Sequence, residues 1–267
     1  MMLNAKLDEK RVPIWNATQG EPYVCPDCGM PVVPHKGPKV IHHFKHKAKS
    51  DCPYGAGETR DHLEAKTLLQ QAFRSRGIPV ESETSVNCLS RFGNRLADLM
   101  TYPPGRSYSV AIELQKSIIS ENEFEMRSKA YARANIYVLW IPFIEQIRLH
   151  TDEIEIQPYG SKIHTFSRYS ARPWEKSLFK LVDEVWYYEP RKKMFWNAIS
   201  IKSCNLEVPN SEFYVPGGEL QSFRGYVHES KRWVELKLRG PYPPEALKVT
   251  RSQNKKRGLM FAHFVGG

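Results

Sequence analysis

The spacing of apolar residues predicts a helix over residues 58–76. Apolar side chains recur there every three or four positions, as on one face of a helix, and Gly77 is placed to end it. That face consists of Ala65, Leu68, Leu69, Ala72 and Phe73. Glu58, His62 and Lys66 recur every four residues along one edge of the same helix. A charged row of this kind is usually a solvated face, so it indicates function only where another motif accompanies it.

Short apolar runs after this helix predict a sheet. Strands are expected over 78–88, 95–100 and 110–115. Pro103, Pro104 and Gly105 separate the second from the third, because these residues cannot extend a β-ladder. Ser120-Glu-Asn-Glu123 is a capping box that opens a second helix to about Asn135. A buried strand over 136–141 follows and ends at Pro142. Since a strand–helix–strand crossover joins parallel strands, the expected core is a mixed sheet.

Two acidic residues lie on neighbouring strands of this expected sheet. Asp98 closes one strand, and the next carries Glu113-Leu114-Gln115 within an apolar run. Because side chains alternate along a strand, Glu113 and Gln115 share one face. A buried carboxylate is costly unless a cation or a donor compensates it, and paired carboxylates are usual ligands of hard divalent metals. The pair therefore predicts a metal site, with a hairpin of solvent-facing acids as the simpler alternative.

Cysteine spacing in residues 1–56 predicts a structural zinc site. The expected ligands are Cys25, Cys28, His46 and Cys52. His46 is favoured because it lies close to Cys52 in sequence, and His43 is the alternative. Four such ligands suit tetrahedral zinc, and a closed site has a structural role. The segment is too small for its hydrophobic core alone to stabilise it, which favours a bound structural metal over reduced structural cysteines.

Beyond about residue 145 the pattern weakens. A helix is expected over 173–185, followed by strands. The expected strands are 186–188, 195–196, 224–227 and 232–238. A basic stretch, 248–257, comes last. Aromatic residues interleaved with basic ones are typical of a nucleic-acid groove, and equally of an ordinary β-rich core.

The amino-acid composition limits the kind of binding partner that the chain is expected to have. The 267 residues include 39 Lys and Arg against 29 Asp and Glu, giving a net charge of +10 and a pI near 9.3. This balance favours a polyanion. The chain starts without a hydrophobic signal region and lacks an apolar run of the roughly 18 residues that span a membrane, so a cytoplasmic location is expected. The chain has five cysteines, two of them in a Cys-x-x-Cys motif, which favours metal ligation over disulfide bonds. Cys88 and Cys204 have no adjacent activating pair, which disfavours a thiol enzyme.

The order and spacing of these motifs resemble the CoiA-like competence protein family over about residues 10–145. The matching features are Cys25-x-x-Cys28, His43-Phe-Lys-His46, Cys52, Glu58 to Lys66, Arg95 to Asp98, Ile112 to Ser117, Arg127, Tyr131 and Val138 to Ile141. The resemblance implies an α+β / α/β fold with a restriction-endonuclease-like (PD-(D/E)xK) mixed-sheet core. It also implies three parts: a zinc-ribbon-like module (1–56), the nuclease core (57–145), and a basic, aromatic-rich α+β region of unknown role (146–267).

The resemblance further implies a Mg- or Mn-dependent deoxyribonuclease that acts in DNA processing, recombination or defence. Asp98, Glu113 and the carbonyl of Leu114 would coordinate the metal. Its water would attack the phosphorus of DNA, with single-stranded or branched DNA among the candidate substrates. Gln115 stands where such nucleases usually carry lysine. It can hydrogen-bond the attacking water but supplies no charge.

Another group should therefore supply the missing cation. Lys66 is favoured, because Lys116 alternates to the other face, and a second metal held by Glu58 is a further option. His62 is expected to position a water or bind phosphate. The expected nucleic-acid contacts are Arg127, Lys116, Lys255, Lys256 and Arg257, although Arg127 could equally form an ion pair within the fold.

Two alternatives follow from the same residues. Glutamine at the lysine position is compatible with a catalytically weak or inactive DNA-binding adaptor in a recombination, competence or defence complex. A zinc-linked module that binds recombination or defence proteins is the second alternative.

Overall fold

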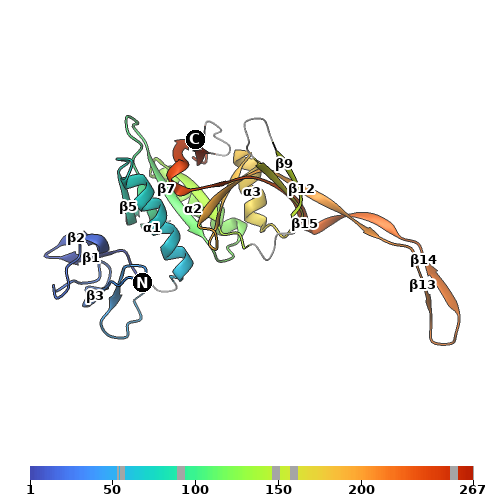
Figure 1. The fold of residues 1–267 in the computed structure, drawn as a ribbon, viewed down its shortest axis with the longest axis horizontal. Helices are drawn as coiled ribbons and strands as arrows, with labels where there is room; N and C mark the ends of the chain where they lie inside the picture. The colour runs from blue at the N-terminus through green and yellow to red at the C-terminus, as the bar shows by residue number, and fades with distance from the viewer. Residues whose placement is uncertain are drawn as a thin grey trace.

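The computed structural model describes residues 1–52, 54, 58–88, 94–145, 151–156, 162–252 and 258–266. Figure 1 shows a small N-terminal module beside helix α1, a central body, and a long two-stranded arm that projects from that body. Among the helices of these residues, none is long and apolar enough to cross a membrane. Gly55-Ala56-Gly57, whose two glycines predict a hinge before α1, lies outside the described residues.

The N-terminal module consists of two small antiparallel ribbons. These are β1 (Asn4–Leu7) with β2 (Lys10–Pro13), and β3 (Val32–His35) with β4 (His43–His46), with the 3-10 turn Ile14–Asn16 between them. Leu3, Tyr23 and Phe44 form the centre of its small core, and Leu63 of α1 packs into it. Arg74 of α1 also stacks over Trp15, 4.1 Å from the ring centroid. The module is therefore docked on α1.

The central sheet has the order β5–β6–β7–β8. Its strands are β5 (Val80–Asn87), β6 (Asn94–Thr101), β7 (Ser109–Gln115) and β8 (Ile136–Pro142). The first two pairings are antiparallel, and β7 pairs with β8 in parallel. The expected mixed sheet and its crossover helix are thus present. The expected strand over 136–141 extends to Pro142.

Helices α1 (Arg60–Arg74) and α2 (Glu121–Arg133) cover opposite faces of this sheet. Leu69 and Phe73 of α1 share a cluster with Ile112, whereas Phe124 of α2 shares another with Trp140. Both helices are two residues shorter at their C-termini than the sequence predicts. α1 is capped by Thr59 through the His62 amide at 3.3 Å, and α2 by Ser120 through the Glu123 amide at 3.1 Å.

The C-terminal region forms an antiparallel five-stranded sheet and a helix, α3 (Pro173–Val182). The sheet order is β11 (Val185–Glu189), β12 (Met194–Val208), β15 (Tyr226–Tyr242), β10 (Lys162–Tyr169) and β9 (Thr151–Ile156). The expected helix over 173–185 ends three residues early, because Asp183 adopts a left-handed conformation with φ 61°.

Strand lengths in this region differ most from the sequence prediction. The strands expected at 224–227 and 232–238 belong to one strand of 17 residues, β15, apart from Arg224 and Gly225. The short strand expected at 195–196 is the start of β12, which has 15 residues. The two strands pair with each other far beyond the body, where most of their residues are exposed. Hydrophobic periodicity does not mark such a segment, since it faces no core.

Beyond the body, the arm ends in the hairpin β13 (Ser211–Tyr214) and β14 (Leu220–Phe223), as Figure 1 shows. A last ribbon pairs β16 (Leu247–Arg251) with β17 (Ala262–Gly266), after the 3-10 turn Pro244–Ala246. Aromatic side chains join the C-terminal region to the central sheet: Trp174 lies 5.9 Å from Trp140, and Phe261 lies 6.2 Å from Phe124. The two regions therefore share one hydrophobic core, and the boundary at residue 145 stays a prediction.

Candidate functional site

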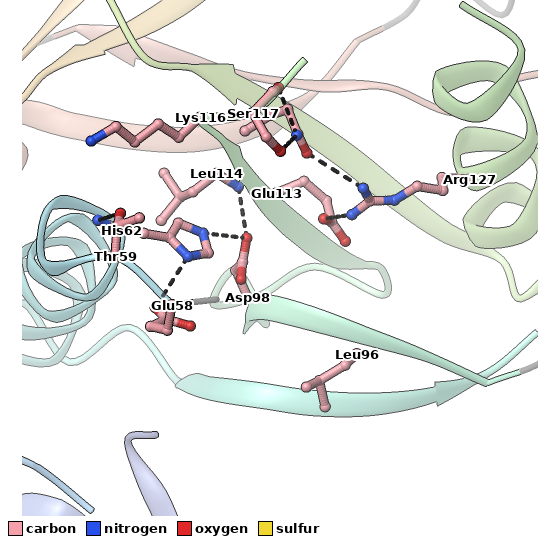
Figure 2. Close-up of a pocket in the computed structure, with 11 residues that line it drawn as sticks. Glu58, Thr59, His62, Leu96, Asp98, Glu113, Leu114, Lys116, Ser117 and Arg127 are labelled. Atoms are coloured by element: carbon pink, nitrogen blue, oxygen red, sulfur yellow. Dashed lines mark hydrogen bonds and ion pairs between the residues drawn. The ribbon is translucent and has the colours of Figure 1, made fainter. Parts of the chain in front are cut away.

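A cavity of about 420 Å³ opens where α1 meets the ends of β6 and β7. It is lined by Glu58, Thr59, His62, Leu96, Asp98, Glu113, Leu114, Gln115, Lys116, Ser117 and Arg127. Figure 2 shows His62 pointing between Glu58 and Asp98, while Arg127 reaches Glu113 from the other side. Most residues that the sequence predicts for the acidic site therefore line one cavity.

Strand register brings Asp98 and Glu113 together. Leu99 on β6 pairs with Ile112 on β7. That pair is the last one of the β6–β7 ladder at this end, and Asp98 and Glu113 are the next residues along each strand. Both line the cavity. The carboxylates thus come from separate strands and face a common space.

Asp98 is held as a carboxylate. Its Oδ2 accepts a hydrogen bond from the Leu114 amide at 2.8 Å and another from His62 Nε2 at 3.1 Å. Burial opposes ionisation, but the charge and hydrogen bond of His62, together with Lys66 and the Leu114 amide, lower the pKa of Asp98 below its ordinary value. Asp98 therefore stays charged and fixed in direction.

His62 lies between two carboxylates. Nδ1 is 3.1 Å from Glu58 Oε1, and Nε2 is 3.1 Å from Asp98 Oδ2. Burial disfavours the imidazolium, but the charge of Asp98 and the hydrogen bonds to Asp98 and Glu58 outweigh it and raise the pKa of His62 to about 10. Near neutral pH both ring nitrogens therefore donate. In this arrangement His62 is a cation near neutral pH.

Glu113 is buried, at 2% exposure, and fully engaged. Arg127 forms an ion pair with its Oε2, and the Tyr131 hydroxyl donates to its Oε1. Burial raises the pKa of Glu113, Arg127 opposes that rise and the neighbouring charge of Asp98 adds to it, so that the pKa is about 7. Glu113 therefore gives up its proton less readily than an exposed glutamate does.

The side-chain amide of Gln115 is engaged by neighbouring residues. Its Nε2 donates to the carbonyl and hydroxyl of Ser117 at 2.9 and 2.8 Å, and its Oε1 lies 3.4 Å from Arg127 Nη1. Arg127 also stacks over Trp140, 4.7 Å from the ring centroid. Arg127 is therefore bound within the fold at the cavity wall, as the ion-pair interpretation of the sequence anticipates.

The two candidate lysines occupy different places. Lys66 is 1% exposed and does not line the cavity; its Nζ lies 3.0 Å from Glu58 Oε1 and 3.1 Å from Glu83 Oε1. Lys116 lines the cavity, and its Nζ lies 2.5 Å from Asp61 Oδ2. Lys66 therefore stands behind Glu58, whereas Lys116 stands at the rim. Lys255, Lys256 and Arg257 lie outside the described residues.

The N-terminal module holds a second candidate site. The ligand atoms of Cys25, Cys28, His46 and Cys52 all lie within 4.8 Å of one another. Cys28 Sγ is 3.4 Å from His46 Nε2, and Cys25 Sγ is 3.8 Å from Cys52 Sγ. His43 instead directs Nδ1 to the Ile41 carbonyl at 2.8 Å. The cluster has the donor set of a structural zinc site and could hold such a metal, with His46 as the histidine.

Within the described residues, this cluster is the only one in which three or more His, Cys, Asp or Glu ligand atoms gather. The acidic cavity is lined by three carboxylates, of which Glu58 is engaged by His62 and Lys66, which leaves Asp98 and Glu113 as the candidate pair. Two carboxylates suit Mg²⁺, which keeps several of its waters, better than they suit a closed protein cage.

Sequence reasoning gave no role to Glu83, Tyr131 or Arg172. Glu83 is buried in β5 at a positive φ of 53°, and Tyr131 lies one turn after Arg127 on α2. Arg172 donates to the Lys116 carbonyl at 3.1 Å and pairs with buried Glu175. An acid in an expected strand and a tyrosine at helical spacing from an arginine are the available signals, and both occur often without function.

Comparison with known families agrees with this arrangement. Residues 6–55 match the family model described as "Competence protein CoiA, N-terminal domain", and residues 58–208 match "Competence protein CoiA, nuclease-like domain". The second match contains all the residues that line the acidic cavity. No curated protein and no solved structure matches the chain significantly.

Proposed function

Because this chain belongs to the CoiA competence protein family, whose nuclease-like domain it contains, we propose that it is a metal-dependent deoxyribonuclease. The proposed type is restriction-endonuclease-like, PD-(D/E)xK, with Gln115 at the lysine position. The observation that supports the proposal is that Asp98 of β6 and Glu113 of β7 line one cavity.

The residues fit a divalent cation on electrostatic grounds. Asp98 raises the pKa of buried Glu113, so the ionised pair repels itself. A cation between or beside the two carboxylates would relieve that repulsion. Asp98 and Glu113, with the carbonyl of Leu114, are the residues that would hold it. When bound, Mg²⁺ or Mn²⁺ would acidify a water and neutralise charge on the scissile phosphate.

The charged residues around the pair have separate proposed tasks. His62 carries a proton on each nitrogen and lines the cavity, so it can donate to a phosphate oxygen if substrate displaces one of its carboxylate contacts. Lys116 at the rim can approach the DNA backbone. Lys66 is a positioning residue: it fixes Glu58, which in turn orients His62.

In this proposal Gln115 forms hydrogen bonds and does not supply the positive charge that lysine usually supplies. Its amide is turned to Ser117, and Arg127 is the nearest cation on its face of the sheet. Arg127 already neutralises part of Glu113, so the positive charge that lysine usually supplies comes from a different position.

A specific observation also favours a second candidate, a DNA-binding adaptor without cleavage. Both Glu113 oxygens are engaged, one by Arg127 and one by Tyr131. Metal ligation by Glu113 requires one of these contacts to lengthen. If neither does, the cavity binds the backbone of DNA through its cations alone.

The deciding experiment measures cleavage of labelled single- and double-stranded DNA with Mg²⁺ or Mn²⁺, alongside DNA binding. Asp98→Ala and Glu113→Gln should abolish cleavage and leave binding nearly intact. Glu81→Gln, an exposed acid on β5, is the matched control and should cleave normally. Binding without cleavage by the unaltered chain, under every metal tried, would support the adaptor and reject the nuclease.

A further inference from the structure

The distal hairpin of the arm exposes apolar side chains on both faces. Every residue of β13 and β14 is exposed, and Tyr214 and Val227 are 74% and 64% exposed. The other large exposed apolar residues of this tip, residues 205–229, are Phe213, Leu220, Phe223 and Tyr226. Soluble monomers rarely expose so many apolar side chains together, so the tip has the character of an interaction surface.

The tip is acidic, although the whole chain is basic. Residues 205–229 contain four glutamates and one arginine, a net charge of −3, against +10 for the chain. Phosphodiester backbones repel such a surface. An apolar surface bearing positive charge is the complementary partner.

The molecule itself presents a surface of that kind. A groove of about 490 Å³ lies between the end of α1, the β6–β7 turn and the β16–β17 ribbon. Its apolar lining includes Phe73, Tyr108 and Val265. Its charged lining residues are Arg76, Arg106 and Lys248, and no acid is among the described residues that line it. The groove thus matches the tip in both hydrophobicity and charge.

The arm holds its tip away from the groove of its own chain. β12 and β15 pair from the body out to Val208 and Tyr226. At the next step Gly225 donates to Asn210 Oδ1 at 2.7 Å, and a Cβ on Gly225 would lie 2.1 Å from the Val208 carbonyl oxygen. This close crossing joins the tip firmly to the ribbon. Figure 1 shows the tip clear of the body, so an occupant of the groove has to come from another molecule.

We propose that the tip docks in the groove of a second copy of this chain. Glu212 and Glu219 of the tip face Arg106 and Lys248 of the groove, and the tip aromatics cover its apolar floor. The contact joins two different surfaces, so a reciprocal exchange of arms closes a dimer. This inference is independent of the proposed nuclease activity, because none of these residues lines the acidic cavity.

Sedimentation velocity of the full chain over a wide concentration range tests the proposal. The unaltered chain should form a dimer. Phe213→Ser with Tyr214→Ser should leave only monomer, with an unchanged melting temperature because both side chains are exposed. Arg106→Glu with Lys248→Glu should do the same. The matched charge control, Lys10→Glu with Arg191→Glu, alters exposed cations elsewhere and should still dimerise.

Exchanging the charges of the tip and the groove tests whether these two surfaces contact each other. Glu212→Lys with Glu219→Lys should abolish the dimer, and combining it with the groove reversal in one chain should restore it. A monomer of the unaltered chain at every concentration overturns the proposal, as does a dimer that survives the tip reversal alone or the groove reversal alone. Loss of DNA binding on groove reversal without any change in mass would also overturn it, since the groove would then serve nucleic acid.

Discussion

Glu83 accepts a hydrogen bond from Lys66 at 3.1 Å, and this buried pair connects the N-terminal module to the acidic cavity. On one side, the Glu83 carboxylate accepts from the Leu3 amide at 2.9 Å and from the Tyr54 hydroxyl at 3.0 Å. On the other, Lys66 contacts Glu58, which contacts His62. A single carboxylate thus connects the N-terminal module to a wall of the cavity.

Glu83→Gln is expected to destabilise the whole chain. The substitution leaves buried Lys66 with one carboxylate fewer, and removing one partner of a buried ion pair costs roughly 3 kcal/mol. Urea denaturation measures the loss. Glu81→Gln lies two residues away on the same strand but is exposed, and it should change stability by at most about 0.5 kcal/mol. Equal effects of the two variants would contradict the buried-pair assignment.

Zinc content should depend on the four-residue cluster. The purified chain is expected to contain one zinc ion, and Cys25→Ser or His46→Ala should lose it, because a structural site needs all its ligands. Elemental analysis measures the metal. Cys204→Ser, which removes a thiol outside the cluster, should keep zinc and serves as the control. Zinc loss should also lower the melting temperature, since binding energy contributes to folding.

The stability of the metal-free chain should fall with rising pH because of Glu113. Its pKa rises from an ordinary 4.5 to about 7 in the folded chain, so the folded state binds more protons than the unfolded state between these values. Stability contributed by protonated Glu113 is present below pH 4.5 and is lost as pH rises through about 7. Glu113→Gln should remove that loss. Urea denaturation of both chains across this range makes the comparison, and parallel curves would refute it.

Metal should stabilise the chain most at high pH, for the same reason. Above pH 7 Glu113 is ionised and repels Asp98, so Mn²⁺ has a fully charged pair to bind. Below that pH, the metal has to displace a proton. Thermal melts with and without Mn²⁺ should show a larger shift at pH 8 than at pH 5.5, and Asp98→Ala should abolish the shift at both.

Gln115→Lys, which introduces the usual nuclease residue, should not increase cleavage. Gln115 Oε1 lies 3.4 Å from Arg127, so a lysine there would place a second cation against the first in a buried position. A stability loss of about 1–3 kcal/mol is expected. Gln115→Met, uncharged and of similar size, is the control for packing. Increased cleavage by the lysine variant would show that Arg127 does not fill the missing role.

The central sheet could be predicted from sequence because each strand is short, apolar and bounded by turn residues. The strand order agrees with Asp98 and Glu113 lining one cavity, and the short sequence separation of His46 and Cys52 agrees with their place in one cluster. The part played by Glu83 could not be predicted, since it depends on a positive φ and on contacts with residues about 80 positions away. The pairing of Arg127 with Glu113 was one of two open alternatives, because helical spacing does not fix which way a long side chain turns.

The length of the arm could not be predicted from the sequence either. β12 and β15 pair through backbone hydrogen bonds over an exposed stretch, and the periodicity of side chains does not report backbone pairing between strands that face no core. In the basic stretch at 248–257, Lys248 lines the groove, whereas the predicted contacts Lys255, Lys256 and Arg257 lie outside the described residues.

Helix α1 presents three consecutive surfaces to three neighbours. His62 turns to the acidic cavity, Leu63 enters the core of the N-terminal module, and Phe73 packs on the sheet. Substitutions that reshape the module therefore disturb the register of His62. During evolution, the segments on either side of Glu58 are therefore constrained to change together. Either segment fused to an unrelated domain would need new residues to cover Leu63 and new ion-pair partners for Lys66.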